Sequence, residues 1–142
     1  ATVELAREAD HDSVIGFYRV LDSSGSVRDP LTGLSVSPGD ASYAEKALLS
    51  NNLVTELAGL TVADDQTSST PYTIEETSII APYAVVNETD TYFAFGAANS
   101  DGYDHFKSLG LNTFGLEDLN GGGDKDNDDM IIRFDFVSNN VI

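Results

Sequence analysis

The chain contains no cysteine, and only 7 of its 142 residues are lysine or arginine. Without cysteine, it can form no disulfide, no thiolate nucleophile and no zinc–thiolate site. The few basic residues stand against 24 acidic ones, which gives a formal net charge of −17 at pH 7. A charge of this size excludes a nucleic-acid backbone or an anionic membrane surface as the natural partner.

Long hydrophobic runs are missing as well. No apolar stretch approaches the roughly 18 residues of a membrane-spanning helix, and we find no signal-peptide pattern. Hydrophobic residues still make up 41% of the chain, enough for one globular domain with a sizeable core. Because the chain starts at Ala1 and ends on Val141 and Ile142, we expect a single module, residues 1–142, cut from a longer protein.

Acidic residues are in excess, and many of them gather in one segment. Residues 117–129 hold six carboxylates and three consecutive glycines, with Lys125 as the single opposing charge. Such like charges repel one another unless the segment is solvated or a cation lies among them. Hard cations such as Ca²⁺ take oxygen ligands, which this segment supplies. We therefore predict a calcium site with ligands from Glu117, Asp118, Asp124, Asp126, Asp128 and Asp129; a solvated acidic turn is the alternative.

The spacing within this segment matches no standard calcium loop. The aspartates from residue 124 onward begin the D-x-[DN]-x-[DN] pattern of helix–loop–helix sites. The sixth position of that pattern should be glycine but is Asp129, and the twelfth, Asp135, falls in a predicted strand. This strand, Met130–Val137, alternates apolar and mixed residues with a period of two, which predicts one face in the core.

A second polar loop, residues 99–105, follows a predicted strand at Thr91–Ala97. It combines two carboxylates, an amide, a phenol and an imidazole within seven residues. That mixture can hydrogen-bond a polar ligand, and its aromatic ring can stack on a sugar or a side chain. A plain turn, or further calcium oxygens, are the other interpretations. We predict ligand contacts from Asn99, Asp101, Gly102, Tyr103 and Asp104.

The remaining pattern is that of strands separated by turns. Strand signals cover Val14–Leu21, Tyr72–Ile80 and Tyr83–Asn87, with Pro82 at a break or edge. We predict an all-β fold, an antiparallel β-sandwich that is jelly-roll-like, with one short helix near residues 42–51.

Several smaller features complete this prediction. In the helix, Ser42 and Glu45 have capping-box spacing, and an inward stripe is expected from Ala44, Ala47 and Leu48. Residues 1–13 fit a strand or a short helix, residues 53–62 are ambiguous, and residues 64–69 fit a polar loop.

The two candidate loops can lie together only if the chain between them reverses. A straight segment across residues 106–116 would carry the chain to the far end of the sandwich. Gly110 and Asn112 favour a reversal within residues 109–112. We therefore expect the two loops side by side at one end.

The acidic segment also carries a resemblance to a family. Residues 114–129 read F-G-L-E-D-L-x-G-G-G-D-x-D-x-x-D, which resembles the signature of a domain-of-unknown-function family. That family occurs near the ends of very large RTX-type and cadherin-repeat surface proteins of cyanobacteria and marine proteobacteria. Residues 93–105 are similar to it as well, and residues 37–48 more weakly. Two positions depart, since the family usually has an aromatic residue at Asn127 and asparagine at Asp128.

The resemblance implies an extracellular, calcium-dependent module of a bacterial adhesin that binds a cell-surface peptide or glycan. It would act as a monomeric module within a long chain, without nucleic acid and without membrane insertion. A calcium-stiffened spacer that binds no ligand is the alternative. We expect no enzyme activity, because adjacent carboxylates on a strand, such as Glu117 and Asp118, point in opposite directions and make a poor glycosidase pair. His105 alone is weak evidence for acid–base catalysis.

Overall fold

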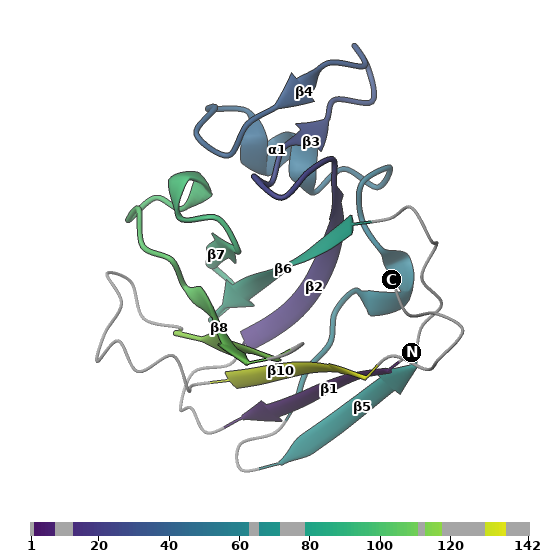
Figure 1. Ribbon diagram of the computed structural model, residues 1–142, viewed down its shortest axis with the longest axis vertical. Coiled ribbons are helices and arrows are strands. Elements are labelled where there is room, and N and C mark those ends of the chain that lie inside the picture. The colour runs from purple at the N-terminus through teal and green to yellow at the C-terminus, as the bar shows by residue number, and fades with distance from the viewer. Residues whose placement is uncertain are drawn as a thin grey trace.

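The computed structural model describes residues 2–7, 13–62, 66–71, 79–110, 113–117 and 130–135, and for residues 134 and 135 it describes the backbone alone. Within these ranges nearly all regular structure is strand (Figure 1). The elements are β1 (Thr2–Arg7), β2 (Ser13–Val20), β3 (Val27–Arg28), β4 (Ser35–Val36), α1 (Tyr43–Ala47), η1 (Thr55–Leu57), β5 (Thr67–Pro71), β6 (Ile79–Val86), β7 (Asp90–Phe93), η2 (Gly96–Ala98), β8 (Phe106–Gly110), β9 (Thr113–Leu116) and β10 (Met130–Asp135).

The strands form two main sheets and one small one. The five-stranded sheet has the order β5-β1-β10-β9-β8, the three-stranded sheet the order β2-β6-β7, and β3 pairs with β4. All of these pairings are antiparallel. In Figure 1 the five-stranded sheet lies at the bottom, and the β3–β4 hairpin and α1 lie at the opposite end. The predicted antiparallel, all-β fold with one short helix is confirmed.

A shared hydrophobic core joins the two main sheets. From the five-stranded sheet, Leu5 and Ile132 are buried, while their neighbours Glu4 and Arg133 are exposed. From the three-stranded sheet, Phe17 of β2 and further buried residues of β2, β6 and β7 belong to the same cluster. The predicted alternation is therefore confirmed for residues 130–133, the part of β10 whose side chains are described, because only every second side chain of a strand can reach the core.

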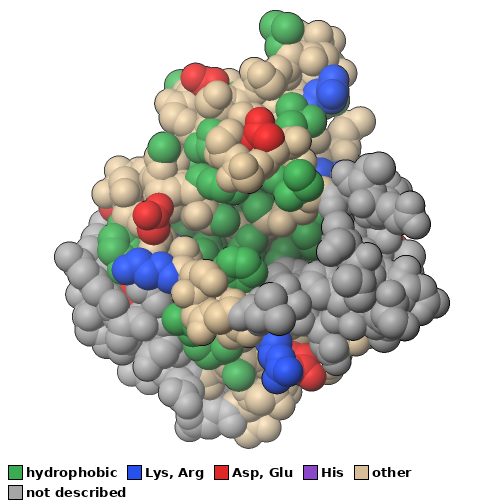
Figure 2. All heavy atoms as spheres, viewed as in Figure 1, with side chains coloured by type: hydrophobic (Ala, Val, Ile, Leu, Met, Phe, Trp, Pro, Cys, Tyr) green, Lys and Arg blue, Asp and Glu red, His purple; other side chains and the backbone are tan. Residues whose placement is uncertain are grey.

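A second cluster lies beneath the β3–β4 hairpin. Tyr18, Tyr43 and Phe93 pack edge to face, with ring centroids 5.5–6.3 Å apart. The Tyr43 hydroxyl donates to the Gly25 carbonyl at 2.6 Å, so it accepts from the Tyr18 hydroxyl at 2.9 Å. Burial raises the pKa of Tyr43 to about 12 and raises that of Tyr18 as well. At the surface over this region, hydrophobic side chains reach solvent near the β3–β4 hairpin (Figure 2).

The helix is shorter than predicted, and its stripe begins one residue earlier. Only residues 43–47 are helical, and Tyr43 and Ala47 are the buried residues. The predicted inward position of Ala44 is wrong, because that residue is exposed. The capping box is also wrong: Ser42 already has helical φ and ψ, −87° and 0°, and its side chain makes no capping bond. An N-cap side chain needs the extended conformation to reach the free amides.

Two strand boundaries differ from the prediction. Pro82 lies inside β6 rather than at a break, opposite Phe17 of β2. It is one residue beyond the last β6–β7 pair, Tyr83 with Phe93, so no strand on that side requires its missing amide. Residues 67–69 were expected in a polar loop but belong to β5, which is the edge of its sheet.

The ambiguous segment at residues 53–62 covers the free side of β2. It forms single bridges from Leu53 to Tyr18 and from Leu60 to Ile15, with the short turn η1 between them. None of the helices in the described part of the chain is long and apolar enough to cross a membrane.

Candidate functional site

The chain reverses between β8 and β9, as the sequence predicted. Phe106 of β8 lies opposite Leu116 of β9, and the pairing shifts register between Ser108 and Gly110. Gly110 has a φ of +151°, a value that side-chain-bearing residues rarely adopt. As a result, the last residue of the loop at 99–105 and the first residue of the acidic segment lie at the same end of the hairpin.

Two hydrogen bonds join these two loops. The Glu117 amide donates to the His105 carbonyl at 2.8 Å, and His105 Nδ1 donates to the Glu117 carbonyl at 2.5 Å. Both side chains are fully buried. The expected proximity of the loops is therefore confirmed where the structure describes them, at His105 and Glu117.

The His105 side chain has contacts at both ring nitrogens and with two aromatic rings. Its Nε2 lies 2.7 Å from Asp101 Oδ2, and its ring stacks on Tyr92 with centroids 3.6 Å apart and planes 17° apart. Tyr103 meets the same ring edge-on. A carbonyl oxygen can only accept a hydrogen bond, so Nδ1 is the donor to the Glu117 carbonyl. The ring thus connects the two loops through a contact at each of its nitrogens.

The loop at 99–105 is built from internal hydrogen bonds. The side-chain oxygen of Asn99, Oδ1, accepts from the backbone amide of Phe93 at 2.7 Å. Its side-chain nitrogen, Nδ2, donates to the backbone carbonyls of Phe93 and Tyr103. It therefore replaces a strand partner, which explains why β7 ends at Phe93 and not at Ala97 as predicted. Such a loop is already ordered before any ligand arrives.

The carboxylates of this loop also hold backbone groups. Asp101 Oδ1 accepts from the Tyr103 amide at 3.0 Å, and Asp104 Oδ1 accepts from the Gly96 amide at 2.9 Å. Asp101 and Tyr103 remain half-buried, and Asp104 is exposed. Gly102, also exposed, has a φ of +67° and lets the loop turn. The loop thus presents a carboxylate, a phenol and a turn to solvent, while Asn99 is committed to the fold.

Most of the predicted metal ligands lie outside the described residues. Of the six, only Glu117 is described, and the other five, Asp118, Asp124, Asp126, Asp128 and Asp129, are not. The chain positions on either side of that segment are fixed, since Leu116 pairs with Met130 on the neighbouring strand. Within the described ranges, no three His, Cys, Asp or Glu side chains gather as a metal site. The calcium site stays a prediction.

The sequence did not predict that Tyr92 stacks on His105, nor that His105 contacts both Asp101 and Glu117. A usable signal was present, because His105 and Glu117 stand immediately outside the two arms of the predicted reversal. A reversal pairs such flanking residues across the hairpin. The burial of the histidine follows only from three-dimensional packing.

Comparison with known proteins gives one result. Residues 48–137, more than half of the chain, match the family model described as Domain of unknown function (DUF4114). No curated protein and no solved structure matches the chain.

Proposed function

The chain belongs to this DUF4114 family of unknown function, and we propose that it is a calcium-dependent, ligand-binding module of a large bacterial surface adhesin that works outside the cell. The observation that carries the proposal is the set of six carboxylates in residues 117–129, opposed by one lysine. Oxygen ligands at this density suit Ca²⁺, which accepts irregular oxygen shells, better than Mg²⁺, which demands a tight octahedron.

The surroundings of the segment support a structural role for the ion. The segment leaves β9 at a buried glutamate, Glu117, and enters β10 at a buried methionine, Met130. An ion bound between these two points would tie together adjacent strands in the five-stranded sheet. It would also offset part of the repulsion that a net charge of −17 imposes on the compact state.

The loop at 99–105 is our proposed ligand contact, and a cell-surface peptide or glycan is the proposed ligand. Asp104 offers an exposed charged acceptor, and Tyr103 offers a half-buried phenol whose ring has Lys107 Nζ at 5.4 Å from its centroid. Because the loop is held by its own hydrogen bonds, binding would lose little conformational entropy. Asp101 contacts His105 and so supports the loop from within.

Calcium should raise the stability of the fold. Extracellular calcium modules bind with Kd values of roughly 10⁻⁴ to 10⁻³ M, so about 10 mM calcium should add roughly 1.4–2.7 kcal/mol. For a chain of 142 residues this is a rise in Tm of about 5–9 °C. Thermal unfolding followed by circular dichroism, with calcium, magnesium and chelator, measures it. A Tm that chelator leaves unchanged would remove the calcium proposal.

A matched pair of variants separates coordination from net charge. Asp126→Asn lies in the acidic segment, and Asp90→Asn lies at an exposed position at the start of β7. Both remove one negative charge, but only Asp126→Asn should weaken the calcium effect. Equal calcium responses from the two variants would assign the effect to general charge screening.

Ligand binding is tested on peptide and glycan arrays with and without calcium. Asp104→Asn keeps an oxygen acceptor for the Gly96 amide but removes the exposed charge. We expect it to weaken binding about tenfold or more, as for one hydrogen bond to a charged group, while leaving the calcium-dependent Tm unchanged. Folded, calcium-loaded protein that captures nothing would favour the spacer.

A further inference from the structure

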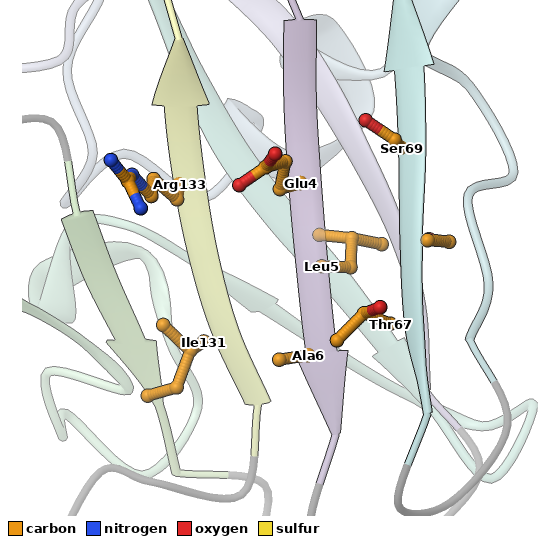
Figure 3. A pocket seen from close by; sticks show the side chains of 8 residues that line it. Glu4, Leu5, Ala6, Thr67, Ser69, Ile131 and Arg133 are labelled. Carbon is orange, nitrogen blue, oxygen red and sulfur yellow. The ribbon is translucent and has the colours of Figure 1, made fainter.

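A hollow of about 380 Å³ opens on the outer face of the five-stranded sheet, over β5, β1 and β10. It lies on the side away from the core, because Leu5 and Ile132 point inward while Glu4 and Arg133 are exposed. Figure 3 shows its lining side chains on the three neighbouring strands. Its volume is at the lower end of the range for small-molecule sites, roughly 300–1,000 Å³.

The strand register arranges this lining in two rows. Glu4 is the direct partner of Ser69 on one side and of Arg133 on the other, which makes one row polar and charged. The next outward row consists of Thr67, Ala6 and Ile131, so two of its three side chains are alkyl groups. The rows lie about 7 Å apart along the strands, and neighbouring strands about 4.8 Å apart. A ligand of the size of one sugar ring can contact both rows.

The charges of the polar row select the chemistry of that ligand. Glu4 can only accept hydrogen bonds, Arg133 can only donate them, and the Ser69 hydroxyl can do both. In Figure 3, Glu4 lies between β1 and β10 and Arg133 lies on the far side of β10, so the two charged groups flank one strand. Their charges cancel, and the net charge of −17 on the chain disfavours anionic ligands. A neutral molecule with several hydroxyl groups fits this arrangement.

We propose that this hollow binds one neutral saccharide unit. Sugar hydroxyls would pair with Glu4, Arg133 and Ser69, and the carbon face of the ring would lie over Ala6 and Ile131. The site is separate from the loop at 99–105, and strands rather than the acidic segment build it. The saccharide would contact no calcium ligand, so it should bind without calcium wherever the protein remains folded, and its failure is distinguishable from failure of the proposed adhesin function.

Amide chemical-shift mapping by NMR tests the proposal on the whole chain. The probes are the methyl glycosides of glucose, galactose, mannose and N-acetylglucosamine at up to about 100 mM, enough to detect affinities weaker than 1 mM. At least one glycoside should shift the amides of Glu4, Ser69 and Arg133, in calcium and in chelator alike. No shift with any of the four would overturn the proposal.

Variants sharpen the test. Glu4→Gln and Arg133→Gln should each weaken the binding about tenfold, as expected for one hydrogen bond to a charged group. Glu45→Gln, on the exposed face of α1, is the matched control and should bind as the parent does. If a variant fails to fold, the shift map of the parent chain decides. Preference for a uronic acid, or shifts caused only by extended peptides along the edge of β5, would each contradict a neutral saccharide site.

Discussion

Replacing Asp101 by alanine should destabilise the whole domain and not only a surface loop. Its carboxylate lies 2.7 Å from His105 Nε2, and the Asp101 side chain is only 7% exposed. On the other side of the ring, Nδ1 holds the Glu117 carbonyl. Asp101→Ala therefore leaves a fully buried ring nitrogen without its acceptor, and it also removes the bond to the Tyr103 amide.

The magnitude lies between two limits. Breaking a buried ion pair by removing one partner costs about 3–5 kcal/mol, because a buried charge is left uncompensated. Leaving a buried polar group without its hydrogen-bond partner costs less, about 1–3 kcal/mol. We expect a loss of about 2–4 kcal/mol, equivalent to a fall in Tm of about 7–14 °C for 142 residues.

Urea and thermal unfolding of four proteins would measure this loss. They are the parent chain, Asp101→Ala, Asp101→Asn and the control Asp90→Ala, whose aspartate is exposed. Asp101→Asn keeps one oxygen acceptor and should lie between the parent and Asp101→Ala. If Asp101→Ala falls within about 0.5 kcal/mol of Asp90→Ala, the reasoning on the buried contact between Asp101 and His105 is refuted. Because His105 also contacts Glu117, Asp101→Ala should reduce the calcium response too.

Three further predictions concern the fold. Burial raises the pKa of Tyr43 from 10.0 to about 12, so the stability that this shift contributes is complete below pH 10 and is lost between about pH 10 and 12. Urea unfolding at several pH values across this range measures the fall in the free energy of unfolding with pH, and Tyr43→Phe should reduce that fall. Glu88 has a φ of +65° in the β6–β7 turn, a conformation that glycine adopts more readily than residues with a side chain. Glu88→Gly should therefore raise the free energy of unfolding by about 0.5–1 kcal/mol, and a lower free energy of unfolding in urea would contradict this. A Cβ at Gly16 would meet the Tyr83 ring, so Gly16→Ala should cost about 1–3 kcal/mol in the same assay, and a neutral result would show that the ring moves aside.

The parts of the fold that the sequence predicted are those with local signals. In β10 the buried Met130 and Ile132 alternate with half-buried or exposed neighbours, and that period is visible in the chain itself. The reversal between β8 and β9 was predicted for the same reason, since Gly110 supplies the backbone freedom that it needs. For the candidate site, this local information was sufficient to bring together His105 and Glu117, the residues at which the two loops meet the hairpin.

The missed parts depend on distant partners. Strand β5 reads T-S-S-T-P, which has no apolar residue to predict burial. It becomes a strand because the backbone groups on one side of β1 pair with it, and edge strands tolerate polar side chains. The early end of β7 is also non-local, because the Asn99 side chain bonds both backbone groups of Phe93 six residues away. Neither contact leaves a periodic trace in the sequence.

The folding unit is larger than the part of the chain that matches the family model. The match begins at residue 48, yet β1 lies between β5 and β10, and β2 pairs with β6 along its whole length. Without residues 2–20, β5 would lose its hydrogen-bonding partner and the core would lose Leu5 and Phe17. The edges of β10 and β6 would then be open for pairing with other chains. Both sheets are therefore complete only when the residues before the match are included, and the strands that lead into the two candidate loops, β7 and β9, belong to sheets that depend on those residues as much as on the matched segment.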